Sequence, residues 1–450
     1  MGITEKGGFT DAGDNKEHHT SSDNNVDSLR IIESYERYIP FQLSNILGKK
    51  IITDVKLGDQ VEKKFTILFS DIRDFTTLSE SLTPKETFDF INSFLNKMAT
   101  VISNNNGVIN KFMGDSVMAI FPYDPDEAVR CSILMLKQLD IFNEDRKKAG
   151  LKAIDIGIGL NTGFCILGIL GNPERYEFTV IGDTVNLASR VESLTKVYGV
   201  PFLVGENTIN SIYDVSKYSI RFIDRVAVKG KKHPQSIYEI FDNDPVEIKK
   251  LKSETKAMFE EALAHYHYKN IDIAKKMLEK CIQINPADNP AKVYLERCKA
   301  FSENSFHQGA KELNEGLEWS SYFEVGHNKI DQQHHELFSK SIKLLDSVDK
   351  NESKSEIESV MVFIDNYIKT HFSTEETFLQ NVKYPFLENQ KKQHINFIRA
   401  FEQLKKEIHA GSISKTYMKF RIHILLIDWI INHILKEDKH YSKFLKRGRL

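Results

Sequence analysis

Two aspartates at the ends of predicted strands constrain the fold of this chain more than any other feature. Asp71 comes two residues after the end of the apolar run 65–69, and Asp115 follows Gly114 in a predicted hairpin turn that leads into the apolar run 117–121. Neighbouring strands would bring the two carboxylates to one place, and hard oxygen ligands of this kind suit Mg²⁺ or Mn²⁺. The alternative for Asp71 alone is an N-cap of the segment that follows it. The paired spacing favours a divalent-metal site.

A third stretch completes a recognisable set of motifs, and it lies about 65 residues further along the chain. The three strings are Phe69-Ser70-Asp71-Ile72-Arg73-Asp74-Phe75-Thr76, Lys111-Phe112-Met113-Gly114-Asp115 and Thr179-Val180-Ile181-Gly182-Asp183-Thr184-Val185-Asn186-Leu187-Ala188-Ser189-Arg190. Together they resemble the catalytic domain of class III nucleotidyl cyclases. The resemblance covers about 180 residues and implies a ferredoxin-like α+β domain at 61–242. Asp74 is expected to cap the helix after the first string.

The resemblance implies a role for each matching residue in forming cyclic AMP and pyrophosphate from ATP. Two Mg²⁺ or Mn²⁺ ions would be held by Asp71, Asp115 and the backbone of Ile72. Adenine would be read by Lys111 and Thr179, the pattern of the subgroup called IIIb, whereas guanylate cyclases usually place Glu and Cys there. Asn186 and Arg190 match the family's transition-state residues. Lys229 and Arg175 are candidates for binding phosphate, and solvated surface cations are the equal alternative.

In this family the metal-binding aspartates and the transition-state residues of one active site come from different subunits. This chain carries both sets, so we expect a homodimer with two equivalent sites. Two rival functions remain open. One is a guanylate cyclase, against which Lys111 and Thr179 argue. The other is an inactive cyclase fold used as a scaffold, against which the intact set of Asp71, Asp115, Asn186 and Arg190 argues. A diguanylate cyclase is not expected, because its Gly-Gly-Asp/Glu-Glu-Phe string is missing.

The last third of the chain reads as a four-helix bundle with inward-facing metal ligands. Between 315 and 445, four amphipathic segments are expected at 328–348, 355–381, 386–409 and 414–438. The motifs resemble a bacterial hemerythrin domain. The resemblance implies a non-haem diiron site with terminal ligands and bridging carboxylates. The terminal ligands would be His334, His371, His394 and His433, and the bridges would be Glu375 and Asp438. A metal-free, purely structural bundle is the alternative.

One position departs from the hemerythrin pattern, because Gln390 stands where the family usually has a histidine. Gln390 could ligate weakly through its carbonyl, or water could take its place. The more open site would favour redox or NO chemistry over stable O2 carriage. His327 and His335 are not expected to be ligands, and Trp429 is expected to form an apolar wall beside the iron. We therefore expect a sensor of O2, NO or redox state.

Composition and patterning set the remaining expectations. Residues 1–26 are predicted to be disordered, 27–60 a helical lead-in and 250–302 a helical connector that resembles a tetratricopeptide helix pair, with a simple spacer as the alternative. A net charge of −2 argues against nucleic-acid binding. The first residues lack signal and myristoylation patterns, no apolar run reaches membrane-spanning length, and the four cysteines form no CxxC pair. These features favour a cytoplasmic protein.

Overall fold

The computed structural model describes residues 41–226, 233–301, 313 and 318–447. The predicted disordered segment 1–26, the lead-in up to residue 40 and Lys229 lie outside the described residues. The chain divides into two compact units, one formed by residues up to 61 together with 168–179, the other by 62–167 and 180 onward. Within the described part of the chain, no helix combines the length and apolar character that crossing a bilayer requires.

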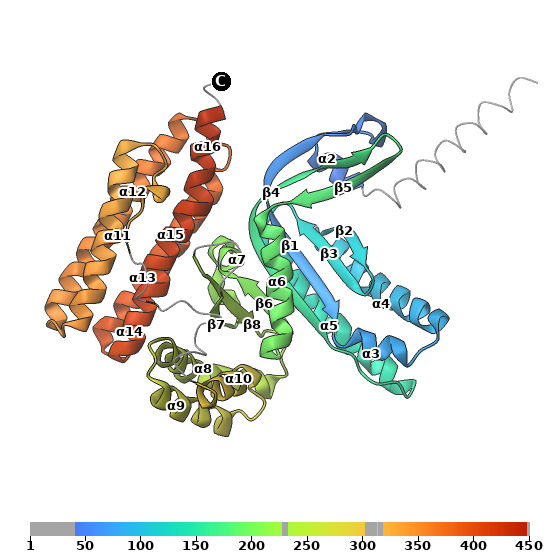
Figure 1. Cartoon of the computed structure of the whole chain (residues 1–450), viewed down its shortest axis with the longest axis horizontal. Coiled ribbons are helices and arrows are strands. Elements are labelled where there is room, and N and C mark those ends of the chain that lie inside the picture. Colours follow the sequence, from blue (N-terminus) through green and yellow to red (C-terminus); the bar gives the residue numbers. More distant parts are fainter. Residues whose placement is uncertain (1–40, 227–232, 302–312, 314–317, 448–450) are drawn as a thin grey trace, which may run out of the picture. The chain divides into compact units, whose positions relative to one another are not determined.

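The described strands form one mixed sheet, which confirms the expected α+β cyclase fold (Figure 1). The strands are β1 (Gln60–Ile72), β2 (Val108–Met113), β3 (Ser116–Phe121), β4 (Ile156–Asn172), β5 (Arg175–Ile181), β6 (Phe202–Gly205), β7 (Ile220–Val226) and β8 (Gln235–Ile240). Their order is β2-β3-β1-β4-β6-β8-β7, and β5 pairs with β4. β3 is antiparallel to both β1 and β2, whereas β4 and β6 run parallel.

Two long helices cover the sheet and bury its apolar side chains. α4 (Pro84–Asn104) begins at a capping box, in which Thr83 and Glu86 satisfy each other's backbone N–H groups. α5 (Pro125–Lys148) begins after Asp124, whose side chain accepts from the N–H of Asp126. Both helices contribute to one core with strands β1, β3 and β4, and its buried members include Leu68, Phe94, Met98, Ala119, Met135, Leu139 and Ile158.

Shorter elements connect these parts. They are α2 (Phe41–Ile46), a 3-10 turn at Ile52–Asp54, α3 (Phe75–Glu80), α6 (Asp183–Tyr198), α7 (Glu206–Ser211) and a 3-10 turn at Val215–Lys217. The connector contains three helices where the sequence suggested a pair: α8 (Val246–His267), α9 (Ile271–Ile284) and α10 (Asn289–Lys299). It packs on the cyclase domain, because Arg221 of β7 is fully buried and ion-paired with Glu239 and with Asp288 before α10.

The C-terminal helices form the expected bundle around one apolar core. After a 3-10 turn at Ser321–Phe323, the first three bundle helices are α11 (Asn328–Asp349), α12 (Lys354–Asn381) and α13 (Leu387–Ala410). The fourth runs on through α14 (Lys415–Ile422), a π-helical segment (His423–Asp428), α15 (Trp429–His433), a second π-helical segment (Ile434–Asp438) and α16 (Lys439–Arg447). It extends nine residues beyond the predicted end at 438, and its two π-helical segments were not expected.

Candidate active site and metal centre

The structure brings Asp71 and Asp115 together at the end of β1. Asp71 lies inside the strand, so it is not the N-cap of a helix. The antiparallel register pairs Ser70 with Val117, and Gly114 in the β2–β3 turn has a φ of +66°, a left-handed conformation that favours glycine. Ser116 then donates to Asp71 through its hydroxyl at 2.6 Å. The hairpin thus places Asp115 beside Asp71.

The two carboxylates form a pair that is suited to a divalent cation. Burial, a hydrogen bond with Asp71 and the charge of Asp71 raise the pKa of Asp115 to about 7. The N–H of Ile72 also donates to Asp115, which places the Ile72 backbone next to both predicted metal ligands. A bound cation would relieve the repulsion between the two acids. The donor set therefore fits Mg²⁺ or Mn²⁺.

Asp74 does not have the capping role that its position suggested. It stands at the N-cap of α3 with a left-handed φ of 51°, and its side chain makes no capping hydrogen bond. The carboxylate pairs instead with Lys196 of α6 at 2.9 Å, on the exposed surface. The left-handed backbone explains the difference, because an N-cap residue that accepts from the first turn is normally extended.

The two transition-state candidates lie on one exposed face of α6. Asn186 and Arg190 are one helical turn apart, and both side chains are exposed. α6 lies directly against β4 at a glycine: a Cβ on Gly159 would come within 2.2 Å of the backbone nitrogen of Glu192. This close approach, which only glycine permits, fixes which face of α6 remains exposed.

That exposed face points away from the aspartate pair of the same chain. Glu192 lies on the side of α6 nearest the aspartate pair. Its Oε1 is 3.8 Å from Nη1 of Arg73. Burial and, after it, the negative charge of Asp71 raise the pKa of Glu192. At about 100° per residue, Arg190 points roughly 160° and Asn186 roughly 120° away from Glu192 around the helix.

The predicted nucleotide-binding residues lie on two strands. Lys111 is part of β2, four residues before Asp115, and is partly buried. Thr179 and Arg175 are both part of β5, where Thr179 is partly buried and Arg175 is exposed. Phosphate binding by Arg175 stays a prediction.

All six predicted iron ligands gather in the interior of the bundle. Ligand atoms of His334, His371 and Glu375 lie within 4.8 Å of one another, and so do those of Glu375, His394 and His433. Glu375 thus belongs to both groups, which is the arrangement a bridging carboxylate needs. Asp438 also faces both sides: one oxygen is 3.3 Å from Nε2 of His334 and the other is 3.4 Å from Nε2 of His433.

Neighbouring side chains orient three of the imidazoles. Nδ1 of His371 lies 3.3 Å from Oε1 of Gln333. Nδ1 of His394 lies 2.7 Å from Oε1 of Glu376, and Nδ1 of His433 lies 3.1 Å from Oε1 of Gln393. A proton on each Nδ1 leaves Nε2 free to bind metal, as in most metal-binding histidines. Both ring nitrogens of His334, Oε2 of Glu375 and Oδ2 of Asp438 are buried without a hydrogen-bond partner among the described residues. These orphaned atoms fit a pair of metal ions.

The electrostatics of the cluster agree with this assignment. Burial lowers the pKa of His334 to about 4 and that of His371 to about 3, so both imidazoles are neutral, the form that binds metal. His394 differs, because its Nε2 lies 3.3 Å from Oε2 of Glu375 and its Nδ1 is hydrogen-bonded to Glu376, and these two carboxylates outweigh burial and raise its pKa to about 9. A cation at the centre would replace that proton.

Gln390 lies within the cluster, one turn before His394. Its amide nitrogen donates to Oδ1 of Asp438 at 2.6 Å and is 3.3 Å from Nε2 of His433. The side chain therefore reaches the expected ligand position. It presents its nitrogen there, so ligation through the carbonyl requires the amide to turn over.

The second π-helical segment explains how one helix supplies two ligands. His433 and Asp438 are five residues apart, and in an α-helix they would point about 140° apart. The hydrogen bonds of a π-helical turn join residues that are five apart, and this wider turn brings Asp438 back to the side of His433. The first π-helical segment does the same for His423 and Asp428, whose side chains approach to 3.5 Å.

The structure adds contacts that the sequence did not indicate. The hydroxyl of Tyr441, which is fully buried, donates to Oε1 of Glu375 at 2.9 Å. Phe372 stacks on His394 with ring centroids 3.8 Å apart. Trp429, the predicted apolar wall, stacks on His433 at 4.4 Å with an interplanar angle of 9°. Tyr441 lies one turn after Asp438, so a fourth helix predicted to extend past 438 would have revealed it.

The two histidines that were not expected to be ligands lie outside the cluster. Nδ1 of His327 accepts weakly, at 3.4 Å, from the N–H of Ile330 at the start of α11. The ring of His335 meets the ring of Trp319 edge-on at 5.4 Å.

Comparison with known proteins matches both halves of the chain. Residues 58–241 match the adenylate and guanylate cyclase catalytic domain, and residues 325–445 match the hemerythrin HHE cation binding domain. An adenylate cyclase of Anabaena cylindrica is 39% identical over 217 residues, which are 47% of this chain and 43% of that protein. The terminal-differentiation-specific adenylate cyclase of Dictyostelium discoideum is 33% identical over 287 residues, 62% of this chain and 13% of the relative.

Adenylate cyclase 1 of Rhizobium meliloti is 32% identical over 217 residues, 46% of this chain and 32% of the relative. The chain spans less than half the length of each of these three proteins. Residues 58–241 are thus similar to the adenylate and guanylate cyclase catalytic domain, and residues 325–445 to the hemerythrin HHE cation binding domain.

Proposed function

We propose that this chain is an adenylate cyclase that converts ATP into 3′,5′-cyclic AMP and pyrophosphate, and that its hemerythrin domain regulates the reaction in response to O2, NO or redox state. The observation that carries the proposal is the pairing of Asp71 with Asp115 in a domain that matches the cyclase family. A cyclase domain implies the use of divalent metal, and a hemerythrin domain implies iron binding.

Asp71, Asp115 and the backbone of Ile72 would hold two Mg²⁺ or Mn²⁺ ions. The ions supply Lewis acidity that makes the ribose 3′-hydroxyl easier to deprotonate and offsets phosphate charge. Ser116 keeps Asp71 in place through its 2.6 Å hydrogen bond. Lys111 donates to a ring nitrogen of adenine and Thr179 accepts from the 6-amino group. Glutamate, which guanine would require, stands at neither position, so ATP is preferred to GTP.

Asn186 would orient the ribose, and Arg190 would stabilise charge that develops on the α-phosphate. Because these two residues point away from the aspartate pair of their own chain, the active site needs two copies of the chain. A homodimer with twofold symmetry would join Asp71 and Asp115 of one copy to Asn186 and Arg190 of the other, and would do so twice. A monomer is expected to be inactive. We place the enzyme in the cytoplasm, where ATP is available.

In the bundle, His334, His371, His394, His433, Glu375 and Asp438 would hold two non-haem iron ions, with Gln390 beside the second. Iron supplies a redox-active centre to which O2 or NO can bind. Gln333, Glu376 and Gln393 hold the imidazoles in the orientation that metal binding requires. Iron content and the visible spectrum of the O2-exposed protein test this assignment. A stable oxygenated spectrum would contradict the expectation of an open, redox-active site.

The proposal is tested by product formation from ATP or GTP with Mn²⁺, using iron-loaded protein that is first reduced anaerobically and then exposed to air. Cyclic AMP at a rate that differs between the two conditions supports the regulated adenylate cyclase. Cyclic AMP at one unchanged rate retains the enzyme and removes the sensor. Cyclic GMP as the main product supports the guanylate cyclase alternative. The absence of both products supports an inactive scaffold.

A further inference from the structure

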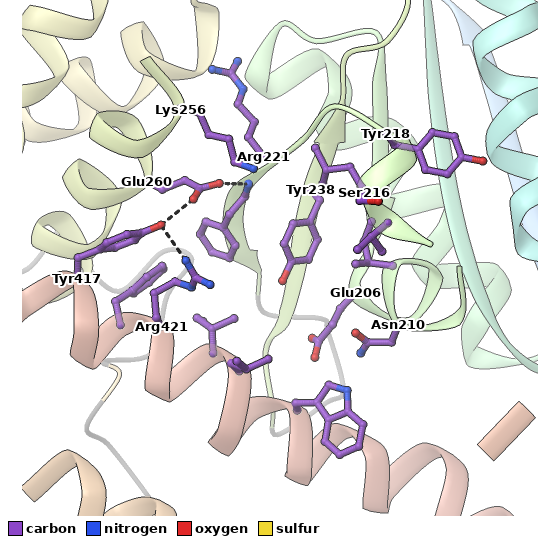
Figure 2. A pocket seen from close by; sticks show the side chains of 18 residues that line it. Glu206, Asn210, Ser216, Tyr218, Arg221, Tyr238, Lys256, Glu260, Tyr417 and Arg421 are labelled. Carbon is purple, nitrogen blue, oxygen red and sulfur yellow. Dashed lines mark hydrogen bonds between the residues drawn. The ribbon is translucent and has the colours of Figure 1, made fainter. Parts of the chain in front are cut away.

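A cavity separate from both sites lies between strands β7 and β8, helices α7 and α8, and the fourth bundle helix (Figure 2). Its volume of about 420 Å³ lies in the range of small-molecule binding sites. Its walls are largely apolar and include the rings of Phe222, Tyr238, Phe420 and Trp429. Flat aromatic walls of this kind favour a flat ring as the occupant.

One end of the cavity offers an acceptor. Glu206 of α7 is only 4% exposed, and its Oε2 accepts from the N–H of Ser236 and from the side-chain amide of Asn432 at 3.3 and 3.2 Å. Its other oxygen has no hydrogen-bond partner among the described residues. Burial raises the pKa of Glu206 to about 6. A ligand that donates a hydrogen bond would satisfy this oxygen.

The other end offers a cation. Lys256 of α8 lines the cavity and has no hydrogen-bond or ion-pair partner within the part of the chain that the structure describes. Its neighbours are already engaged: Glu260 accepts from the N–H of Phe222 and from the hydroxyl of Tyr417, and Arg421 pairs with Glu407. Figure 2 shows Tyr238 between Lys256 and Glu206. The cavity therefore presents an acceptor and a cation across an aromatic centre.

We propose that this cavity binds a small aromatic anion, whose ring lies among the aromatic walls and donates a hydrogen bond to Glu206, and whose acidic group pairs with Lys256. Adenine nucleotides and hydroxylated aryl carboxylic acids share this chemistry. Binding is independent of cyclase turnover, because none of the cavity residues belongs to the predicted catalytic set.

Trp429 makes binding measurable and connects it to the bundle. Its ring forms part of the cavity wall and stacks on His433. The chain contains two tryptophans, Trp319 and Trp429. The substitution Trp319→Phe therefore leaves Trp429 as the single reporter, and a ring bound against it changes its fluorescence.

The experiment titrates full-length Trp319→Phe protein, without added Mg²⁺ or Mn²⁺, with AMP and separately with 4-hydroxybenzoate. Fluorescence of Trp429 is followed with excitation at the long-wavelength edge of tryptophan absorption, beyond the absorption of both probes. We expect a saturable change with at least one probe. Saturation by AMP alone identifies a nucleotide as the source, and saturation by 4-hydroxybenzoate identifies an aryl acid.

Variants decide whether the cavity is responsible. In the Trp319→Phe background, Lys256→Gln should weaken binding about tenfold, the loss expected for one hydrogen bond to a charged group. Glu206→Gln should weaken binding as well and serves as the second variant. Lys250→Gln, on an exposed position of the same helix, should leave affinity unchanged. The proposal is overturned if neither probe saturates, or if binding is equally tight in Lys256→Gln and Glu206→Gln, which would place AMP in the cyclase site.

Discussion

The ion pair between Arg225 and Asp428 offers a direct test of the contact between the cyclase domain and the bundle. Arg225 belongs to β7, and Asp428 ends the first π-helical segment of the fourth bundle helix. Nε of Arg225 donates to Oδ2 at 2.6 Å and Nη2 donates to Oδ1 at 2.7 Å, a bidentate geometry. The two residues are only 6% and 5% exposed. Removing one partner would leave a buried, uncompensated charge.

The expected cost follows from this burial. Arg225→Met or Asp428→Asn should each lower the free energy of unfolding by about 3–5 kcal/mol. The double variant leaves no unpaired charge, so its cost should be smaller than the sum by about 2–3 kcal/mol. Burial acts to raise the pKa of Asp428, but the charge of Arg225 holds it well below its usual value. The contribution is therefore complete at neutral pH and is lost only as the solution becomes strongly acidic.

The assay is urea unfolding at pH 7, followed by both circular dichroism and fluorescence because a chain with several domains can unfold in several steps. Asp365→Asn is the matched control, since Asp365 pairs with Lys405 and Lys369 at the bundle surface and should cost at most about 1 kcal/mol. Additive single-variant costs would refute the reasoning, because they would show that the pair is not formed in solution. If the bundle regulates through this contact, the double variant should also lose the difference between reduced and air-exposed rates.

Three further predictions concern the two sites. Asp71→Ala and Arg190→Ala should each reduce cyclase activity at least about 10²-fold. Mixing equal amounts of the two proteins should restore about a quarter of the wild-type rate, because half of the dimers then hold one intact site out of two. Replacing Lys111 by Glu together with Thr179 by Cys should shift product from cyclic AMP to cyclic GMP, measured with both substrates in competition. Gln390→His should raise the iron content per chain and stabilise the spectrum of the O2-exposed protein; unchanged content would show that this position does not bind iron.

The sequence was sufficient to predict candidate site residues that stand at the ends of strands. Asp71 and Asp115 could be paired in advance, because an apolar strand and a glycine turn leave few ways to arrange them. The six bundle ligands could be predicted because the resemblance to hemerythrin domains marks their positions. The register that brings Ser116 to Asp71 could not be predicted, since hairpin register depends on the packing of both strands.

The fourth bundle helix was harder to predict for a physical reason. Helical periodicity assumes 3.6 residues per turn, and the two π-helical segments depart from it. The pattern therefore loses phase near Asp438, so the predicted helix ended there and Tyr441 was missed. The missed second-layer partners Gln333, Glu376 and Gln393 have ordinary polar side chains, which only the packed structure shows to face imidazoles.

The same two π-helical segments place separate chemical contacts on a short stretch of one helix. Asp428 reaches Arg225 of the cyclase sheet, the next residue Trp429 lines the cavity and stacks on His433, and Asp438 faces the other half of the metal centre. A π-helical turn is a rare local departure from the α-helix and is frequent at functional sites. This stretch of helix therefore forms a continuous covalent connection between His433 and Asp428, the residue that contacts the cyclase sheet. If the hemerythrin domain regulates the cyclase as proposed, this helix is the element through which a difference in ligand affinity between two states would have to act.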